Sequence, residues 1–161
     1  MRVLAMDPIE EAYRTNHQRL WRSLLAYTGD AEVATDAAAE TYSQALGRGE
    51  ELVDPAAWIW RTAFRVAAGM LADRSRRWRD IELVDLDGDP VFSDVAGDPD
   101  LVEFLDQLSS LSDQQRAVVV LRYSGGFTPT EIAGLLDTTP NSVRVQLHRA
   151  HAHLRERIDR Q

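Results

Sequence analysis

The sequence predicts an all-α protein with two small helical domains joined by an acidic flexible linker, the second domain containing a helix-turn-helix. Three observations predict this fold class. Apolar residues recur at helical spacing along most of the 161 residues, and alternating strand patterns are nearly absent. Helix-capping signals stand in front of several of these periodic segments. One central segment mixes acidic residues, glycine and proline, which is typical of a linker.

The first domain, residues 1–79, is expected to hold three helices. The first covers about 7–27 and stops at Gly29, a residue type that commonly ends helices. The second is expected over about Asp30–Leu46, with the aspartate as its cap. The glycines of Gly47–Gly49 are expected to break it.

The third helix is opened by Asp54-Pro55, a cap followed by proline at the first helical position, and reaches about Arg79. The linker follows over residues 80–97. Ten acidic residues and no basic residue stand between Asp80 and Asp106. One hypothesis is therefore that the acidic linker screens the arginine-bearing domains from nucleic acid and keeps the free protein compact.

The second domain, residues 98–161, is expected to hold four helices. Asp98-Pro99 repeats the signal of a cap followed by proline. Ser112–Gln115 has the pattern of a capping box in front of the apolar run Val118–Leu121. Gly125-Gly126 ends that helix, and the last two helices follow it.

The segment Thr128–Ala150 has the layout of a helix-turn-helix. Thr128–Glu131 forms a second capping box in front of a short helix, and Asp137–Thr139 supplies a tight turn. Two short helices at a steep angle need a small residue where they cross, and Ala133 supplies it. Thr139-Pro140 opens the last helix.

The last helix is predicted to present an arginine-bearing face outward. Val143 and Leu147 are four residues apart and are expected to face inward. Arginine can form two hydrogen bonds with guanine in the major groove, and a helix N-terminus can hold a phosphate. From this pattern alone, an amphipathic hairpin with a solvated basic face remains an alternative. The expected outward residues are Asn141, Ser142, Arg144, Val145, His148 and Arg149.

Charge is strongly segregated along the chain. The net charge of −8 is unusual for a protein that binds nucleic acid. From Thr139 to Gln161, however, five arginines stand beside only two acidic residues, Glu156 and Asp159. The positive charge that a nucleic-acid surface needs is therefore concentrated in the last helix.

Several function classes are excluded by what the sequence lacks. It has no cysteine, and therefore no disulfide framework, thiolate metal site or cysteine nucleophile. No apolar run approaches the roughly 20 residues that span a bilayer, and no secretory signal is present, so we expect a cytoplasmic protein without membrane insertion. His148, His151 and His153 lack the spacing and supporting ligands of a zinc site. No phosphate-binding loop or catalytic triad pattern is found, and we expect no catalytic activity, metal or cofactor.

Two stretches of the sequence carry a family pattern. One consists of Leu111–Tyr123, Gly126–Thr128, Glu131–Ala133 and Asn141–Arg144. It resembles the fourth conserved region of extracytoplasmic-function (ECF) sigma factors. The other resembles their second conserved region, and it consists of Gly29-Asp30, Ala34, Asp36, Glu40–Tyr42, Ala45, Trp58–Arg61 and Ala63.

The resemblance implies a division of labour between the two domains. The first would bind the clamp helices of the largest subunit of core RNA polymerase and melt the −10 promoter element, and the second would read the −35 element. An anti-sigma factor is a further partner that the resemblance allows. The polymerase-facing residues would lie on the second helix, where a solvated face with Tyr42 packed in the core is the alternative. They are Asp36, Glu40, Tyr42 and Ser43.

The third helix combines aromatic and cationic side chains, which can hold unpaired bases by stacking and by backbone charge. We expect Trp58 to pack in the core, and Trp60 and Phe64 to share another face. A basic run near the end of this helix suits promoter phosphates, although a solvated helix end is an alternative. The expected −10 residues are Trp60, Arg61, Phe64, Arg65, Arg76 and Arg77.

The sequence departs from the family pattern in three places. Ala39 stands where glutamine is common, Arg65 replaces a frequent asparagine, and the loop Gly47–Asp54 is short and acidic. The favoured function is an ECF-type sigma factor that binds core RNA polymerase and directs promoter-specific transcription initiation. The main alternative is a stand-alone helix-turn-helix transcriptional regulator. A third is an interaction protein that mimics a sigma factor without initiating transcription.

Overall fold

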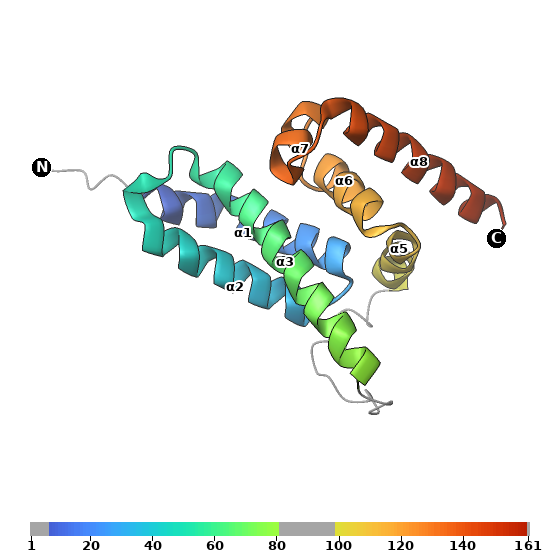
Figure 1. Ribbon diagram of the computed structural model, residues 1–161, viewed down its shortest axis with the longest axis horizontal. Helices are drawn as coiled ribbons and strands as arrows, with labels where there is room; N and C mark the ends of the chain where they lie inside the picture. The colour runs from blue at the N-terminus through green and yellow to red at the C-terminus, as the bar shows by residue number, and fades with distance from the viewer. Residues whose placement is uncertain (1–6, 81–98, 161) are drawn as a thin grey trace, which may run out of the picture.

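A computed structural model describes residues 7–80 and 99–160, and all regular structure in these two ranges is helical (Figure 1). The all-α fold class predicted from the sequence is therefore confirmed. Residues 81–98, which make up nearly all of the expected linker, lie outside the described residues. None of the described helices is long and apolar enough to cross a membrane.

The first helical group consists of α1 (Pro8–Thr28), α2 (Ala31–Arg48) and α3 (Pro55–Asp80), which pack against one another. Gly29 ends α1 in the left-handed conformation, with φ +68°. The Asp30 side chain caps α2 by accepting a hydrogen bond from the backbone N–H of Val33 at 3.1 Å. These ends agree with the sequence prediction.

The end of α2 lies slightly beyond its predicted position. The helix continues through Gly47 and ends at Gly49, whose φ of +55° favours glycine. A short 3-10 turn, η1 (Gly49–Glu51), then leads towards α3. Asp54 caps α3, because its Oδ1 accepts a hydrogen bond from the backbone N–H of Ala57 at 3.2 Å.

The second helical group consists of α5 (Pro99–Ser109), α6 (Asp113–Tyr123), α7 (Pro129–Leu136) and α8 (Pro140–Asp159). Both predicted capping boxes are present, Ser112 with Gln115 before α6 and Thr128 with Glu131 before α7. The four helices that the sequence predicts for this part of the chain are therefore all found.

The two helical groups lie side by side and share one continuous hydrophobic core (Figure 1). In the first group the core contains Leu20, Leu24 and Ile59, and in the second it contains Val118 and Ile132, all almost completely buried. Helix α6 packs against α1, and α7 packs against α3. The contact between the groups therefore runs through α1 and α3 on one side and α6 and α7 on the other.

Candidate nucleic-acid interface

Hydrogen bonds of the backbone and of the Thr139 side chain hold the turn of the helix-turn-helix. Asp137 adopts the left-handed conformation with φ +58°, which aspartate tolerates better than most residues. The Thr138 N–H donates to the carbonyl of Ala133 at 2.9 Å, and the Thr139 side chain accepts from the Ser142 N–H at 3.1 Å. Ala133 is buried where the two helices meet, as the sequence predicts. The start of α8 is therefore fixed relative to α7.

Helix α8 presents its predicted reading face to solvent. Val143 and Leu147 are buried, so the opposite side of the helix points outward. Among the described residues, neither Arg144 nor Arg149 has an ion-pair partner that would occupy its guanidinium group. The predicted reading residues Asn141, Arg144, Val145, His148 and Arg149 are exposed, and Ser142 is half-buried.

Polar contacts fix α8 against α5 and α6. The Tyr123 hydroxyl and Nε2 of His151 are 2.7 Å apart and hydrogen-bonded. The Arg157 guanidinium forms an ion pair with the Asp106 carboxylate and donates to the Asp106 carbonyl at 3.4 Å. Arg157 therefore ties α8 to α5 instead of standing free for a phosphate.

The aromatic residues of α3 are mostly covered. Trp60 is 2% exposed and Phe64 is 4% exposed, whereas Arg61 and Arg65 are exposed. Trp58, which we expected in the core, is only half-buried. The Arg48 guanidinium lies over the Trp58 ring, 5.5 Å from the ring centre. Trp58 and Trp60 are two positions apart, so they point to opposite sides of the helix. The side with Trp60 is the one that the second helical group covers.

Two residues of the expected −10 set cannot be placed. The backbone of α3 is described as far as Asp80, but the side chains of residues 74–80 lie outside the described ones. Arg76 and Arg77 fall in this stretch. Their predicted contact with promoter phosphates stays a prediction.

The predicted polymerase-facing residues lie on the outer side of α2, apart from one. Asp36, Glu40 and Ser43 are exposed, whereas Tyr42 is half-buried and packs edge-on against Tyr13 at 4.9 Å between ring centres. Burial, with a smaller contribution from the neighbouring phenol group of Tyr13, raises the pKa of Tyr42 to about 12. The Tyr42 hydroxyl is buried and has no hydrogen-bond partner among the described residues. Tyr42 therefore packs against α1 and is not a freely exposed residue of α2.

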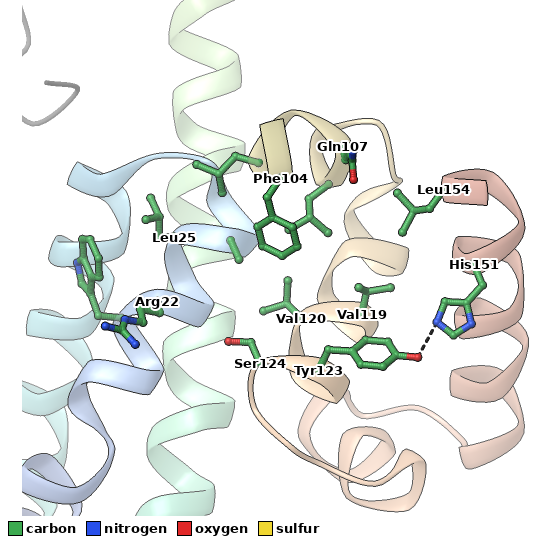
Figure 2. A pocket seen from close by; sticks show the side chains of 14 residues that line it. Arg22, Leu25, Phe104, Gln107, Val119, Val120, Tyr123, Ser124, His151 and Leu154 are labelled. Atoms are coloured by element: carbon green, nitrogen blue, oxygen red, sulfur yellow. Dashed lines mark hydrogen bonds between the residues drawn. The ribbon is translucent and has the colours of Figure 1, made fainter. Parts of the chain in front are cut away.

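An apolar groove of about 550 Å³ lies between α1, α5, α6 and α8 (Figure 2). Phe104 and Tyr123 stand 50% and 63% exposed at its wall, a large exposure for two aromatic side chains. The sequence pattern alone does not predict this groove. The sequence of α5 nevertheless contains an indication of it, since residues 101, 102, 104, 105 and 108 are all apolar. This apolar stripe is wider than a helix needs when only one of its sides is packed.

In residues 7–80 and 99–160, no three His, Cys, Asp or Glu side chains form a group that could hold a metal ion. Exposed charged side chains lie instead on the surfaces of the helices, for example Glu40 on α2, Arg61 on α3 and Arg144 on α8. This arrangement suits contact with large partners.

Comparison with known proteins identifies the family. Residues 101–154, which contain α6, α7 and most of α5 and α8, match the family described as Sigma-70, region 4. The ECF RNA polymerase sigma factor SigL of Mycobacterium tuberculosis is 35% identical over 146 residues, covering 84% of this chain and 80% of that protein. The RNA polymerase sigma-E factor of Streptomyces coelicolor is 28% identical over 152 residues, covering 92% of this chain and 85% of that protein.

Solved structures share the fold over nearly the whole chain. One is the sigma factor RpoE in complex with the anti-sigma factor NepR from Bartonella quintana, with a TM-score of 0.75 at 19% identity, covering 93% of this chain and 96% of that one. Another is CnrH in complex with the cytosolic domain of CnrY, with a TM-score of 0.71 at 18% identity, covering 95% of this chain and 88% of that one. The length and identity of the sequence match to SigL show that the chain belongs to the family of ECF RNA polymerase sigma factors.

Proposed function

We propose a division of labour for this sigma factor, which binds core RNA polymerase and directs transcription initiation. The first helical group, residues 1–79, binds polymerase through α2 and the −10 element through α3. The second group, residues 98–161, binds the −35 element through α8. The polymerase supplies the chemistry, so the role requires no catalytic residue from this chain and places the protein in the cytoplasm.

The observation that carries the proposal is the reading face of α8. Its arginines are exposed on a helix whose N-terminus is fixed by the turn at Asp137, inside the segment that matches sigma region 4. Arginine on such a helix can read guanine in the major groove. The exposure of Arg144 and Arg149 therefore supports their proposed role in reading duplex DNA.

Transcription in vitro tests the function directly. Core polymerase together with this protein should initiate transcription at a promoter from which core polymerase alone does not initiate. A stand-alone regulator would instead bind duplex DNA without polymerase and start nothing. A protein that binds polymerase and yields no transcript would support the third alternative, a mimic of sigma factors.

The polymerase surface has its own test. Reversing both charges, Asp36→Arg with Glu40→Arg, should abolish pull-down of core polymerase, because both residues are exposed on one side of α2. The same change in charge on other exposed residues, Glu11→Arg with Glu156→Arg, should leave the pull-down intact. Equal pull-down by both variants, each folded as judged by circular dichroism, would exclude this surface.

We also propose that the groove beside α5 receives an apolar helix of an anti-sigma factor. Of the two solved proteins with this fold, one is in complex with the anti-sigma factor NepR and the other is in complex with the cytosolic domain of CnrY. The groove supports the same role here because Phe104 and Tyr123 expose apolar area that a partner helix could cover (Figure 2).

The protein encoded beside this gene is the partner to try first, if it has a small cytosolic helical domain. Co-expression should give a stable complex with the wild type, and Phe104→Asp should prevent it. Val53→Asp is the control, since Val53 is fully exposed on the loop before α3, away from the groove. A complex that survives Phe104→Asp would exclude the groove as the docking site.

A further inference from the structure

The apolar groove between α1, α5, α6 and α8 has no carboxylate in its lining. Fourteen described residues line it, and none of them is aspartate or glutamate (Figure 2). The chain as a whole carries 26 acidic and 18 basic residues. Leu25, Leu108 and Val120 form part of the apolar lining, so apolar contacts supply most of the attraction for a partner. A partner helix that carries negative charge would meet no like charge among these fourteen residues.

Most polar side chains in the lining already have a hydrogen-bond partner within the described residues. The pairs, with the distances between their bonded atoms, are Trp21 with Thr35 (3.0 Å), Gln107 with Glu103 (3.4 Å), Tyr123 with His151 (2.7 Å) and Ser124 with Ser23 (2.8 Å). A docking helix gains little specificity from these groups, because breaking an existing hydrogen bond offsets most of what a new one contributes.

Arg22 is the exception among the polar side chains of the lining. It is exposed on the α1 side of the groove, across from His151 of α8 (Figure 2). Within the part of the chain that the structure describes, its guanidinium forms no ion pair. Positions 18, 19, 25 and 26, one turn away on α1, are glutamine, arginine, leucine and alanine, so the helix itself offers no carboxylate. The guanidinium group is therefore free to bind a partner.

A helix that covers Arg22 needs a negative group opposite the guanidinium. Filling the groove removes water from around this charge, and the burial of an unpaired charge is unfavourable. A carboxylate offsets the cost best, because arginine can bind it with two parallel, charge-assisted hydrogen bonds. An apolar residue at the same place would leave the guanidinium unpaired, and a lysine or arginine would add repulsion.

We propose that Arg22 is the specificity-determining residue of the groove and that it selects a helix with one carboxylate beside an apolar stripe. The proposal rests on the proposed docking of an anti-sigma helix in this groove, and it adds the charge that the helix carries. The carboxylate lies where the helix passes α1, and the apolar stripe covers Phe104 and Tyr123. The apolar contacts supply the affinity, and Arg22 discriminates against helices of the opposite charge.

Selection from a library of displayed helices tests the proposal. Each helix has about four turns, a fixed leucine stripe and randomised flanking positions, and the full chain is the bait. The wild type should enrich aspartate or glutamate at one flanking position, and Arg22→Glu should enrich lysine or arginine at that same position. Arg14→Glu is the matched control and should keep the wild-type preference, because Arg14 is exposed on α1, pairs with Glu10 and does not line the groove.

A double-mutant cycle on one selected helix measures the pair. Replacing the selected carboxylate by lysine should weaken binding to the wild type about tenfold, and Arg22→Glu should bind this lysine peptide within about threefold of the original pair. Both differences should shrink with added salt. Fluorescence anisotropy of the labelled synthetic peptide gives the dissociation constants. Circular dichroism checks that Arg22→Glu folds, as expected for a substitution at an exposed position.

The outcomes separate the role of Arg22 from that of the groove itself. Helices that lose binding to Phe104→Asp, but have the same residues whether selected on the wild type or on Arg22→Glu, would overturn the role of Arg22 and leave the groove as the docking site. Helices that bind Phe104→Asp as tightly as the wild type would instead contradict the proposed docking in the groove. Recovery of no helix would contradict both. Tyr123→Asp, on the same groove, repeats the test if Phe104→Asp does not fold.

Discussion

The two faces that we assign to promoter DNA are in different states in the same molecule. On α8, Arg144, His148 and Arg149 are exposed to solvent. On α3, Trp60 and Phe64 are almost completely buried beneath the second helical group. The face on α8 is accessible to DNA, whereas the face on α3 is covered by other residues of the protein.

The chemistry of the side chains explains this difference. Arginine side chains are well solvated and remain stably exposed until they bind a DNA duplex. Exposed aromatic rings leave apolar area in water, so packing against a surface that covers them is favourable. A face built to stack on unpaired bases is therefore prone to pack against its own chain. In this protein Phe127 makes that contact.

Removing the Trp60 side chain should have the largest effect on stability. Trp60→Ala should lower the free energy of unfolding by about 3–5 kcal/mol, as expected for truncation of a fully buried aromatic side chain. Trp58→Ala should cost clearly less, because Trp58 is only half-buried. Unfolding in urea followed by circular dichroism measures both. Equal losses would mean that Trp60 is no more buried in solution than Trp58.

The opposite behaviour is expected on α8. Arg149→Ala or Arg144→Ala should leave the unfolding free energy nearly unchanged, since both residues are exposed. At least one of them should weaken binding of the polymerase complex to the −35 element by about 1–3 kcal/mol and relax the preference at one base pair. Selection from a library randomised in the −35 element measures the preference. Recovery of the wild-type sequence by both variants would show that the reading face is assigned incorrectly.

The helices could be predicted from sequence because their signals are local. Asp30, Ser112, Thr128 and Thr139 each cap the helix that the sequence assigns to them. Gly47 was misjudged for a physical reason. A glycine near the end of a helix weakens it by only about 1 kcal/mol and need not stop it, and the required positive φ occurs at Gly49.

The environment of α3 could not be predicted in the same way. Helical periodicity places Trp58 and Trp60 on different sides, but it does not say which side another part of the chain covers. The partner of Trp60 is Phe127, which is distant in sequence and belongs to the other helical group. For α8 the pattern sufficed, because one apolar stripe packs inward and everything else is left outside.

A smaller effect distinguishes two arginines beyond the reading face. Arg155 and Arg157 lie further along α8 than the reading face, where at most a phosphate contact is expected, but Arg157 pairs with Asp106. Arg157→Ala should therefore lower the unfolding free energy by about 0.2–1 kcal/mol, the range for a partly exposed ion pair, without changing the salt dependence of DNA binding. Arg155→Ala should leave stability unchanged and, if it touches a phosphate, lower the salt slope by about one. A reduced slope for Arg157→Ala would contradict this assignment.

The smallest expected effect depends on pH and belongs to the helix-turn-helix alone. The backbone N–H of Thr128 donates to Oε1 of Glu131 at 3.1 Å, and this bond, together with the contact to the Thr128 side chain, lowers the pKa of Glu131 below its ordinary value of 4.5. A carboxyl group with a lowered pKa in the folded state stabilises the fold above its ordinary pKa, and the contribution is lost as the pH falls through the lowered value.

Glu131→Gln keeps a side chain that can complete the capping box but does not titrate. As the pH falls from 5 to below the ordinary pKa of 4.5, the wild type should therefore lose slightly more stability than the variant, measured by urea midpoints at several pH values. Because Glu131 is exposed, the difference should be small and should shrink with added salt. The two stability curves running parallel through this pH range would mean that the capping box does not hold the carboxylate in solution.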